Sequence, residues 1–479
     1  MSDLAIRSGR FWTKVGTKFL PFADAATPEL PLSRLLRLSL FQVTVGMAMA
    51  LTIGTLNRVM IVELGVSTTL VSVMIGLPLV FAPLRAMIGF KSDTHRSVLG
   101  WRRVPFIWFG SMLQFGGLAI MPFALIVLSG DNGAPVVVGQ CGAALAFLLI
   151  GAGMQTTQTA GLALATDLAS DAVRPRVVAM MCSMLLVGVV VSGFIFSLLL
   201  THFTPVRLIQ VIQGAAALTM IVNVIALWKQ EPRNPDLFLA TATDEPDFWR
   251  SWWAFSAAAP NLRRFLWALG LGTVAFAMQD TLLEPYGGEV LHLGVAQTTM
   301  LTALTAGGGL ASFAVAARWL MRGMDPYRLA AYGLLAGLPA FISVLMAAPL
   351  ESPLLFRIGA TLIGFGAGMF SVGTLTAAMG LDKAGRTGLA LGAWGAVQAT
   401  GSGLAIGAAG IIRDIVASLA NHGKLGVVLS GHATGYGTVY YIEIILLLAS
   451  LVAVGPLVRH TVPTRLASPA GFDLTRQPT

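Results

Sequence analysis

The chain of 479 residues has a composition suited to lipid: 56% of its residues are hydrophobic, only 11% are charged, and its mean hydropathy is +0.77. A typical soluble domain is about 25% charged, so these values exclude that class and indicate an integral membrane protein. The formal net charge of +9 needs no nucleic-acid partner, because membrane proteins gather lysine and arginine in their cytoplasmic loops.

Residues 1–35 form the first predicted element, a basic amphipathic segment ahead of any membrane span. Four cations follow helical spacing beside an apolar face: Arg7, Arg10, Lys14 and Lys18. Such a helix lies on an anionic membrane surface, where lipid phosphates complement its charge. A basic tail without regular structure is the alternative.

Twelve apolar runs follow, each long enough to cross a hydrocarbon core of about 30 Å as a helix. They lie at about 36–62, 67–90, 104–128, 136–165, 177–200, 206–228, 264–286, 296–320, 328–349, 353–380, 388–412 and 438–458. Continuous runs do not resemble the short alternating strands of a β-barrel. The sequence therefore predicts an all-α polytopic membrane protein with twelve transmembrane helices.

The distribution of basic residues predicts how these helices are oriented. Most of the 31 lysines and arginines lie in the two terminal segments and in alternate breaks between the runs. The positive-inside rule makes the side that carries them cytoplasmic. Both termini should therefore be cytoplasmic.

The break after the second run combines glycines, an acid and two arginines. The residues are Gly89, Asp93, Gly100, Arg102 and Arg103. A carboxylate near a helix end can bind neighbouring guanidinium groups and so latch adjacent helices in one conformation. A solvated basic loop that only sets the topology is the alternative.

Two markers recur at one spacing in the two halves of the chain. The sequence GAGM at 151–154 recurs at 366–369, and Asp167 recurs as Asp382. Arginines follow each aspartate: Arg174 and Arg176 in the first half, and Arg386 in the second. A duplicated six-helix unit explains both markers, so the two halves should be pseudo-symmetric.

The longest polar break, 229–263, is the expected cytoplasmic loop between these halves. It separates an N-terminal six-helix half at 36–228 from a C-terminal half at 264–458, and 459–479 is a cytoplasmic tail. Glycines also cluster in the later runs, with three in succession at 307–309. Such residues predict close helix packing, and room for a flat ligand or another helix is the alternative.

Twelve helices in two halves with a basic central loop resemble the major facilitator superfamily, and the break at 89–103 resembles its cytoplasmic signature with extra residues inserted. Three further stretches narrow the resemblance: 34–42, GTLNRVMIVELG at 54–65, and QDTLLEPYGG at 279–288. Together they resemble the bacteriochlorophyll-delivery branch of that superfamily over nearly the whole chain.

This resemblance implies an assembly factor for light-harvesting complexes of purple phototrophic bacteria. Such a protein binds bacteriochlorophyll, transiently or stably, or delivers it to the antenna alpha and beta polypeptides in the intracytoplasmic photosynthetic membrane. The reaction-centre–antenna core complex and enzymes of pigment synthesis are further partners that the resemblance suggests.

The polar residues within the runs are the candidates for contact with a pigment. The six histidines all map to loops or helix ends, so none is expected as a ligand in the middle of the membrane. The remaining candidates are amides: Asn57, Gln155, Gln158, Gln279 and Gln398. Hydrogen bonds between helices are the alternative role for each of them. No metal site formed by protein ligands is expected.

Charged residues within the runs suggest a contact between the two halves. Arg58 in the first run and Glu284 in the seventh occupy equivalent places in the repeat, with Asp280 one helical turn away from Glu284. In the superfamily that the chain resembles, these helices line a central cavity, where a buried charge needs a partner. We therefore expect Arg58 to pair with Glu284 or Asp280. Snorkelling of Arg58 toward the lipid headgroups is the alternative.

Two other functional classes compete with the assembly factor. A secondary transporter would use Arg58, Asp280 and Glu284 to bind a solute or tetrapyrrole or to couple its transport. An enzyme of pigment synthesis lacks support, because the sequence shows no metal-ligand cluster, nucleotide-binding loop or nucleophile–base arrangement. We therefore expect no enzymatic activity.

Overall fold

The structure is a computed structural model that describes residues 30–80, 101–130, 133, 135–170, 173–231, 261–380, 387–422, 424 and 433–458. Every regular element within these ranges is a helix, which confirms the all-α fold. Eleven of the helices are long and apolar enough to cross a membrane, and a twelfth apolar helix at Thr68–Leu79 is shorter in the described residues. The protein is therefore a multi-pass membrane protein.

The N-terminal half contains six of these spans. The first is α2 (Leu32–Met49), which continues through two π-helical stretches, η2 (Ala50–Leu56) and η3 (Val59–Glu63). The others are α3 (Thr68–Val80), α5 (Val104–Leu128), α6 (Val136–Leu168), α7 (Arg174–Leu199) and α8 (Pro205–Leu227). Proline in the first turn of α5, α7 and α8 suits a helix start, where its missing N–H leaves no bond unmade.

The C-terminal half repeats this series. Its first span is α10 (Leu262–Ala277), followed by a 3-10 turn, η5 (Met278–Thr281), and α11 (Leu283–Glu289). The others are α12 (Val295–Met321), α13 (Pro326–Ala347), α14 (Pro353–Gly380), α15 (Thr387–Asn421) and α16 (Ala433–Val458). The first span of each half is thus irregular near its end.

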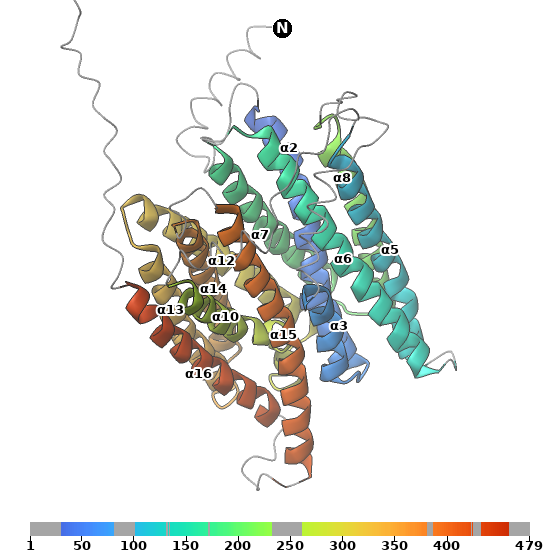
Figure 1. Cartoon of the computed structure of the whole chain (residues 1–479). Helices are drawn as coiled ribbons and strands as arrows, with labels where there is room; N and C mark the ends of the chain where they lie inside the picture. Colours follow the sequence, from blue (N-terminus) through green and yellow to red (C-terminus); the bar gives the residue numbers. More distant parts are fainter. Residues whose placement is uncertain are drawn as a thin grey trace, which may run out of the picture.

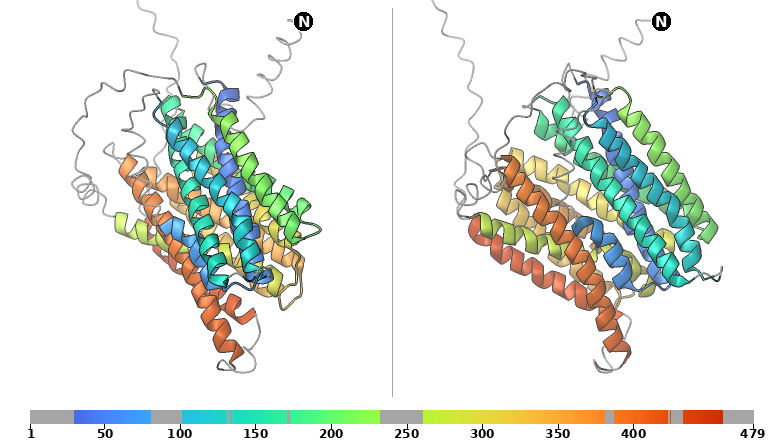
Figure 2. Two further views of the ribbon diagram at one scale, coloured as in Figure 1. Left: turned by 90° about the vertical axis from the view of Figure 1, so that its right-hand side faces the viewer. Right: turned by 45° about the vertical axis from the view of Figure 1, so that its right-hand side comes forward.

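The contacts between helices also repeat in the two halves. Helix α5 packs on α6 as α13 packs on α14, and α2 contacts α7 and α8 as α10 contacts α15 and α16. The halves meet through two equivalent pairs, α3 with α15 and α7 with α12. Figure 1 and both views of Figure 2 show the two groups of helices, with α3 and α15 side by side between them.

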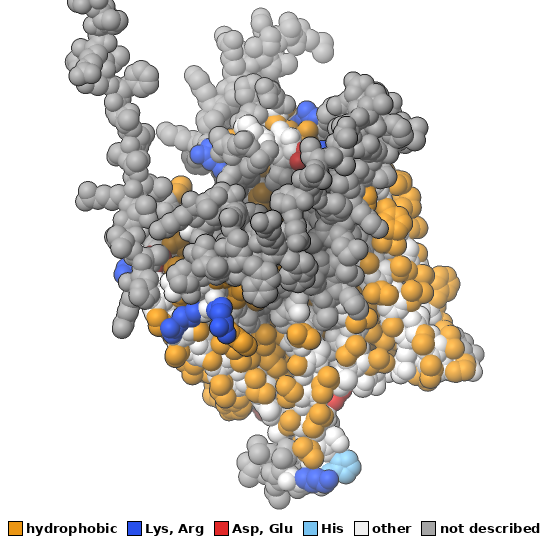
Figure 3. All heavy atoms as spheres, viewed as in Figure 1, with side chains coloured by type: hydrophobic (Ala, Val, Ile, Leu, Met, Phe, Trp, Pro, Cys, Tyr) orange, Lys and Arg blue, Asp and Glu red, His pale blue; other side chains and the backbone are white. Residues whose placement is uncertain are grey.

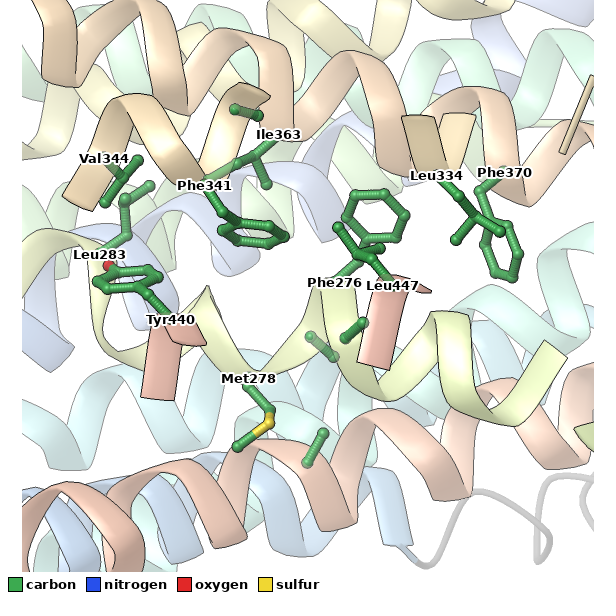
Figure 4. Close-up of a cluster of buried hydrophobic side chains, with 14 of the residues drawn as sticks. Phe276, Met278, Leu283, Leu334, Phe341, Val344, Ile363, Phe370, Tyr440 and Leu447 are labelled. Atoms are coloured by element: carbon green, nitrogen blue, oxygen red, sulfur yellow. The ribbon is translucent and has the colours of Figure 1, made fainter. Parts of the chain in front are cut away.

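The C-terminal half has a large apolar core of its own, whereas the main core of the N-terminal half also includes Val295, Ala306 and Ile406 of the other half. In the C-terminal half, Phe276, Phe341 and Tyr440 lie together with Met278 and Leu283 (Figure 4). The ring centroid of Phe341 lies 6.2 Å from that of Phe276 and 6.2 Å from that of Tyr440. This core fixes the end of α10, and hence the position of the η5 turn.

Glycine allows the closest approach between helices in the second half. A Cβ atom on Gly308 of α12 would lie 2.0 Å from the carbonyl oxygen of Thr361, and one on Gly364 of α14 would lie 1.8 Å from that of Thr305. Neither position has room for a side chain. Gly307 differs, because no atom lies within 4 Å of the equivalent point.

The surface of the helices is apolar, as a lipid-facing protein requires. Many large hydrophobic side chains are exposed, among them Phe109, Phe123 and Val452. Figure 3 shows hydrophobic side chains spread over the visible flank of the bundle. An aqueous surface would not tolerate apolar patches of this extent.

Candidate functional site at the junction of the two halves

The two irregular first spans touch each other where their helices depart from α geometry. The side-chain amide of Asn57, between η2 and η3, donates a hydrogen bond of 2.9 Å to the carbonyl oxygen of Thr281 in η5. Asn57 is fully buried. π-Helical turns and broken membrane helices occur often at functional sites. This junction, formed by η2, η3 and η5, is therefore the candidate site.

Close packing against α12 accompanies the π-helical geometry of η2. A Cβ atom on Gly54 would lie 2.2 Å from the Oγ1 atom of Thr302. The hydroxyl groups of Thr55 and Thr299 lie 3.2 Å apart and share a hydrogen bond. The β-branched residues Thr52, Ile53 and Thr55 surround Gly54 and crowd a regular α-helical turn.

Arg58 is buried at the junction, with only 4% of the residue exposed, so it does not reach outward to headgroups. One of its Nη atoms forms an ion pair with Glu63, and the other donates a hydrogen bond of 3.2 Å to the carbonyl oxygen of Leu293. Arg58 thus joins the two halves, but through a backbone carbonyl of the second half. The expected pairing with Glu284 or Asp280 was wrong.

The π-helical geometry explains this error. In an α-helix, residues 58 and 63 point in different directions, because each residue turns about 100° around the axis. A π-helical turn bonds residue i to residue i+5, and so brings Glu63 beneath Arg58. Glu284 accepts a hydrogen bond of 2.6 Å from the hydroxyl of Thr302, and Asp280 accepts one from the side chain of Gln279.

A third acid, which the sequence analysis did not single out, lies beside the η5 turn. Glu443 of α16 is fully buried, and neither of its carboxylate oxygens has a hydrogen-bond partner among the described residues. Its only sequence signal is a single acidic residue in the run 438–458. The nearby cations are paired elsewhere, Arg58 with Glu63 and Arg413 with Glu289 and Asp414. Among the described residues, the C-terminal side of the junction therefore carries three acids with no cation paired to them.

Further hydrogen bonds between the halves gather at this end of the bundle. Thr69 at the start of α3 donates bonds of 2.7 Å and 2.8 Å to Asp414 near the end of α15. Ser197 near the end of α7 donates one of 2.8 Å to the carbonyl oxygen of Ala296 at the start of α12. These contacts close the bundle at the end where the first span of each half finishes.

A second cluster of charges lies at the opposite end of the N-terminal half. Arg102 and Arg103 both donate to Oδ2 of Asp167, at 3.2 Å and 3.0 Å. The backbone N–H groups of Arg102, Arg103 and Val104 donate to the carboxylate of Glu231, at 2.7 to 3.1 Å. An anion at this position complements the partial positive charge of the α5 N-terminus.

This cluster combines residues from two predicted motifs. The arginines of the expected latch bind the aspartate of the expected repeat, so α5 is tied to the end of α6. Arg176 is exposed at the start of α7. The remaining members of both motifs lie outside the described residues or have no described side chain: Gly89, Asp93, Gly100, Arg174, Asp382 and Arg386. The latch stays a prediction.

The two arginines should contribute unequally to stability. The Arg103 side chain is 6% exposed and that of Arg102 is 32% exposed. Replacing Arg103 by Gln should cost about 2 kcal/mol, because it removes a charged hydrogen bond from a buried place. Replacing Arg102 by Gln should cost below about 1 kcal/mol, as for an exposed ion pair. Thermal unfolding of the two variants in detergent measures the difference, and equal losses would contradict it.

The amide candidates are spread over several elements. Besides Asn57, only Gln279 lies at the junction, where it donates to Asp280. Gln398 of α15 donates to the hydroxyl of Ser371 at 3.4 Å, and Gln158 of α6 is partly buried. The amide oxygen of Gln155, also in α6, is buried without a hydrogen-bond partner among the described residues. The hydrogen bond of Asn57 fits the role of linking helices.

Within the described part of the chain, no group of three or more His, Cys, Asp or Glu side chains could hold a metal ion. The described histidines, His202, His292 and His422, lie in loops or turns at helix ends, where the sequence analysis placed them. The basic N-terminal stripe, Arg7, Arg10, Lys14 and Lys18, falls outside the described residues. Its role as a membrane-surface helix stays a prediction.

The fold matches known transporters. The crystal structure of a bacterial homolog of the human lysosomal transporter Spinster, in an inward-facing conformation, aligns with a TM-score of 0.65 at 14% identity, covering 93% of this chain and 100% of that one. Identity at this level shows the fold alone. The chain therefore shares the fold of that transporter, and the contacts that repeat between its two sets of six helices agree with the two pseudo-symmetric halves that the sequence predicted.

Proteins with similar sequences identify a narrower family. The Protein PucC of Rhodovulum sulfidophilum is 57% identical over 406 residues, which cover 84% of this chain and 89% of that protein. The Protein PucC of Cereibacter sphaeroides is 50% identical over 457 residues, covering 94% and 98%. A more distant relative from Rhodobacter capsulatus, named Bacteriochlorophyll synthase 44.5 kDa chain, is 26% identical, covering 76% and 83%. The family model described as PUCC protein matches residues 55–462, and the chain belongs to the PucC family.

Proposed function

We propose that the protein is a non-enzymatic assembly factor for light-harvesting complexes, which binds bacteriochlorophyll or delivers it to antenna alpha and beta polypeptides. Membership of the PucC family carries this proposal, since the matched residues 55–462 contain most of the stretches that resemble the bacteriochlorophyll-delivery branch. The reaction-centre–antenna core complex and pigment-synthesis enzymes are the further partners. The site of action is the photosynthetic cytoplasmic membrane, with both termini and the segment 229–263 on the cytoplasmic side.

A groove on the lipid-facing side supports contact with an apolar client. It has a volume of about 380 Å³ and lies between α7, α12 and α14. Its lining is almost wholly apolar and includes Phe194, Leu304, Gly307 and Phe365. Gly307 is not required by helix packing, because no atom lies within 4 Å of its missing Cβ. The groove could accept the apolar face of an antenna helix or the tail of a pigment.

The buried polar groups allow one way to hold the pigment. The magnesium of bacteriochlorophyll accepts an axial ligand, and oxygen is the donor that magnesium prefers. The amide oxygen of Gln155 fits this chemistry, because it is buried without a hydrogen-bond partner among the described residues. Gln155 would hold and orient the macrocycle by that oxygen.

The test is purification of the full-length protein in mild detergent from a pigmented host, followed by absorption spectroscopy and identification of the co-purifying polypeptides. Bacteriochlorophyll together with antenna or reaction-centre subunits is the expected result. A Gln155→Leu variant should retain less pigment, whereas Gln140→Leu on the same helix, which is not one of the pigment candidates, is the matched control. A colourless protein without partners would overturn the proposal.

Transport is the second candidate, and the acidic side of the junction favours it. Asp280, Glu284 and Glu443 lie in membrane spans without a cation paired to them among the described residues. Acids in such places often carry protons or bind substrate. Solute uptake by the colourless protein in liposomes, abolished by Glu443→Gln, would support this candidate over the assembly factor.

A further inference from the structure

A large cavity opens at the end of the N-terminal half that carries the charge cluster. It has a volume of about 1390 Å³ and lies between the start of α2, the start of α5 and the end of α8. Three tryptophans line it: Trp101, Trp108 and Trp228. Pockets for small molecules usually measure about 300–1,000 Å³, so the cavity suits a larger occupant.

The charges in this cavity do not balance. Arg34, Arg37 and Lys229 line it together with one acid, Glu231. The carboxylate of Glu231 is occupied by three backbone N–H groups at the start of α5. Arg34 donates to the backbone and side-chain oxygens of Gln230, which carry no charge. Among the described residues, the lining therefore retains positive charge that no anion balances.

The side chain of Arg37 shows where in the cavity an anion is needed. Its Nε atom is buried and has no hydrogen-bond partner among the described residues. Leaving a buried donor of a charged group unpaired is costly. An anionic group in the cavity would supply the missing acceptor.

The remaining walls are apolar and continue onto the lipid-facing surface. Val104, Val224 and Leu227 line the cavity. Next to them, Phe109 of α5 and Ile225 of α8 are exposed on the outside of the bundle. The occupant should therefore have an anionic head in the cavity and apolar chains along α5 and α8.

We propose that this cavity binds an anionic phospholipid, with its phosphate against Arg34, Arg37 and Lys229. Guanidinium groups bind phosphate through paired, charge-assisted hydrogen bonds, and tryptophan suits the level of the headgroups. Basic pockets between membrane helices are known to bind such headgroups. A fully esterified chlorin complements the cavity less well, because it carries no ionised group to meet these cations. This inference is independent of the proposed function.

The test measures lipid retention by the full-length protein in neutral detergent. The protein is mixed with equal amounts of phosphatidylglycerol and phosphatidylcholine that have the same acyl chains, and the bound lipid is counted by native mass spectrometry. Phosphatidylglycerol should be retained preferentially. The double variant Arg37→Gln with Lys229→Gln should lower this preference roughly thirtyfold, because it removes two charges near the headgroup.

Two further variants distinguish the loss of a specific lipid site from the general effect of removing positive charge. Arg318→Gln with Arg322→Gln removes the same charge from exposed positions at the end of α12, and should keep the preference. Arg37→Lys with Lys229→Arg keeps the charge, and should keep most of the binding.

Three results would overturn the proposal. The first is equal retention of the two lipids by the wild type, and the second is an equal loss in both charge-removing variants. The third is displacement of phosphatidylglycerol by an equal concentration of a chlorin with a free carboxylate, which would assign the cavity to an acidic tetrapyrrole.

Discussion

A single methyl group at Gly308 should destabilise the C-terminal half by about 1–3 kcal/mol or more. The new Cβ of Gly308→Ala would lie 2.0 Å from the carbonyl oxygen of Thr361, so α12 and α14 must move apart. Backbone cannot yield as a flexible side chain does, and overpacking of this kind costs energy in that range. Thermal unfolding in detergent and the yield of folded protein in the membrane measure the effect.

The neighbouring residue provides a matched control. Gly307→Ala makes the same chemical change one position earlier in α12, where no atom lies within 4 Å of the added Cβ. It should leave stability unchanged or raise it slightly, because alanine favours the helix. If the two variants lost the same stability, the close packing of α12 on α14 would not be the cause.

At the junction, replacing Glu63 should lower the stability of the protein more than replacing Arg58. Glu63→Gln leaves the Arg58 charge buried without its carboxylate, a change that costs about 3–5 kcal/mol in buried pairs. Arg58→Gln leaves Glu63 behind, but that side chain is 39% exposed and stays hydrated. The expected cost is then about 1.5–3 kcal/mol, the range for hydrogen bonds to charged groups.

Thermal unfolding of the two single variants and the double variant tests this order. The double variant should resemble Arg58→Gln alone, because no buried cation remains. Glu284→Gln is the control, since Glu284 bonds to Thr302 and not to Arg58. If Glu284→Gln lowered the stability more than Glu63→Gln, the result would contradict this order. It would support instead the pairing of Arg58 with Glu284 that the sequence suggested.

Most of the fold could be predicted because the bilayer dictates the length of apolar runs. The predicted runs 104–128 and 353–380 coincide with the bounds of α5 and α14. Equivalent contacts in the two halves, such as α5 with α6 and α13 with α14, follow the repeat that the GAGM motif indicated. The length of α15 was predicted least well. The apolar run was expected to end at residue 412, but the helix continues through more polar residues to Asn421.

The candidate site was predicted only in part. The sequence singled out Asn57, Arg58, Asp280 and Glu284, and all four lie in or beside the irregular stretches. Their partners could not be inferred, because the pattern of apolar and polar residues in the run does not indicate where a π-helical turn occurs. The role of Asp167 as the acceptor for Arg102 and Arg103 was missed for another reason: only the tertiary fold brings the end of α6 to the start of α5.

The π-helical stretch Ala50–Leu56 also sets the rotational phase of the first span. Before it, Leu32–Met49 packs against α7 and α8; after it, Asn57 and Arg58 face the second half. Each residue of an α-helix advances about 100° around the axis. Deleting one residue from the stretch would therefore turn Asn57 and Arg58 away from their acceptors while every side chain in the junction stayed the same. Chain length between residues 49 and 57 is as much a determinant of the junction as the residues that form it.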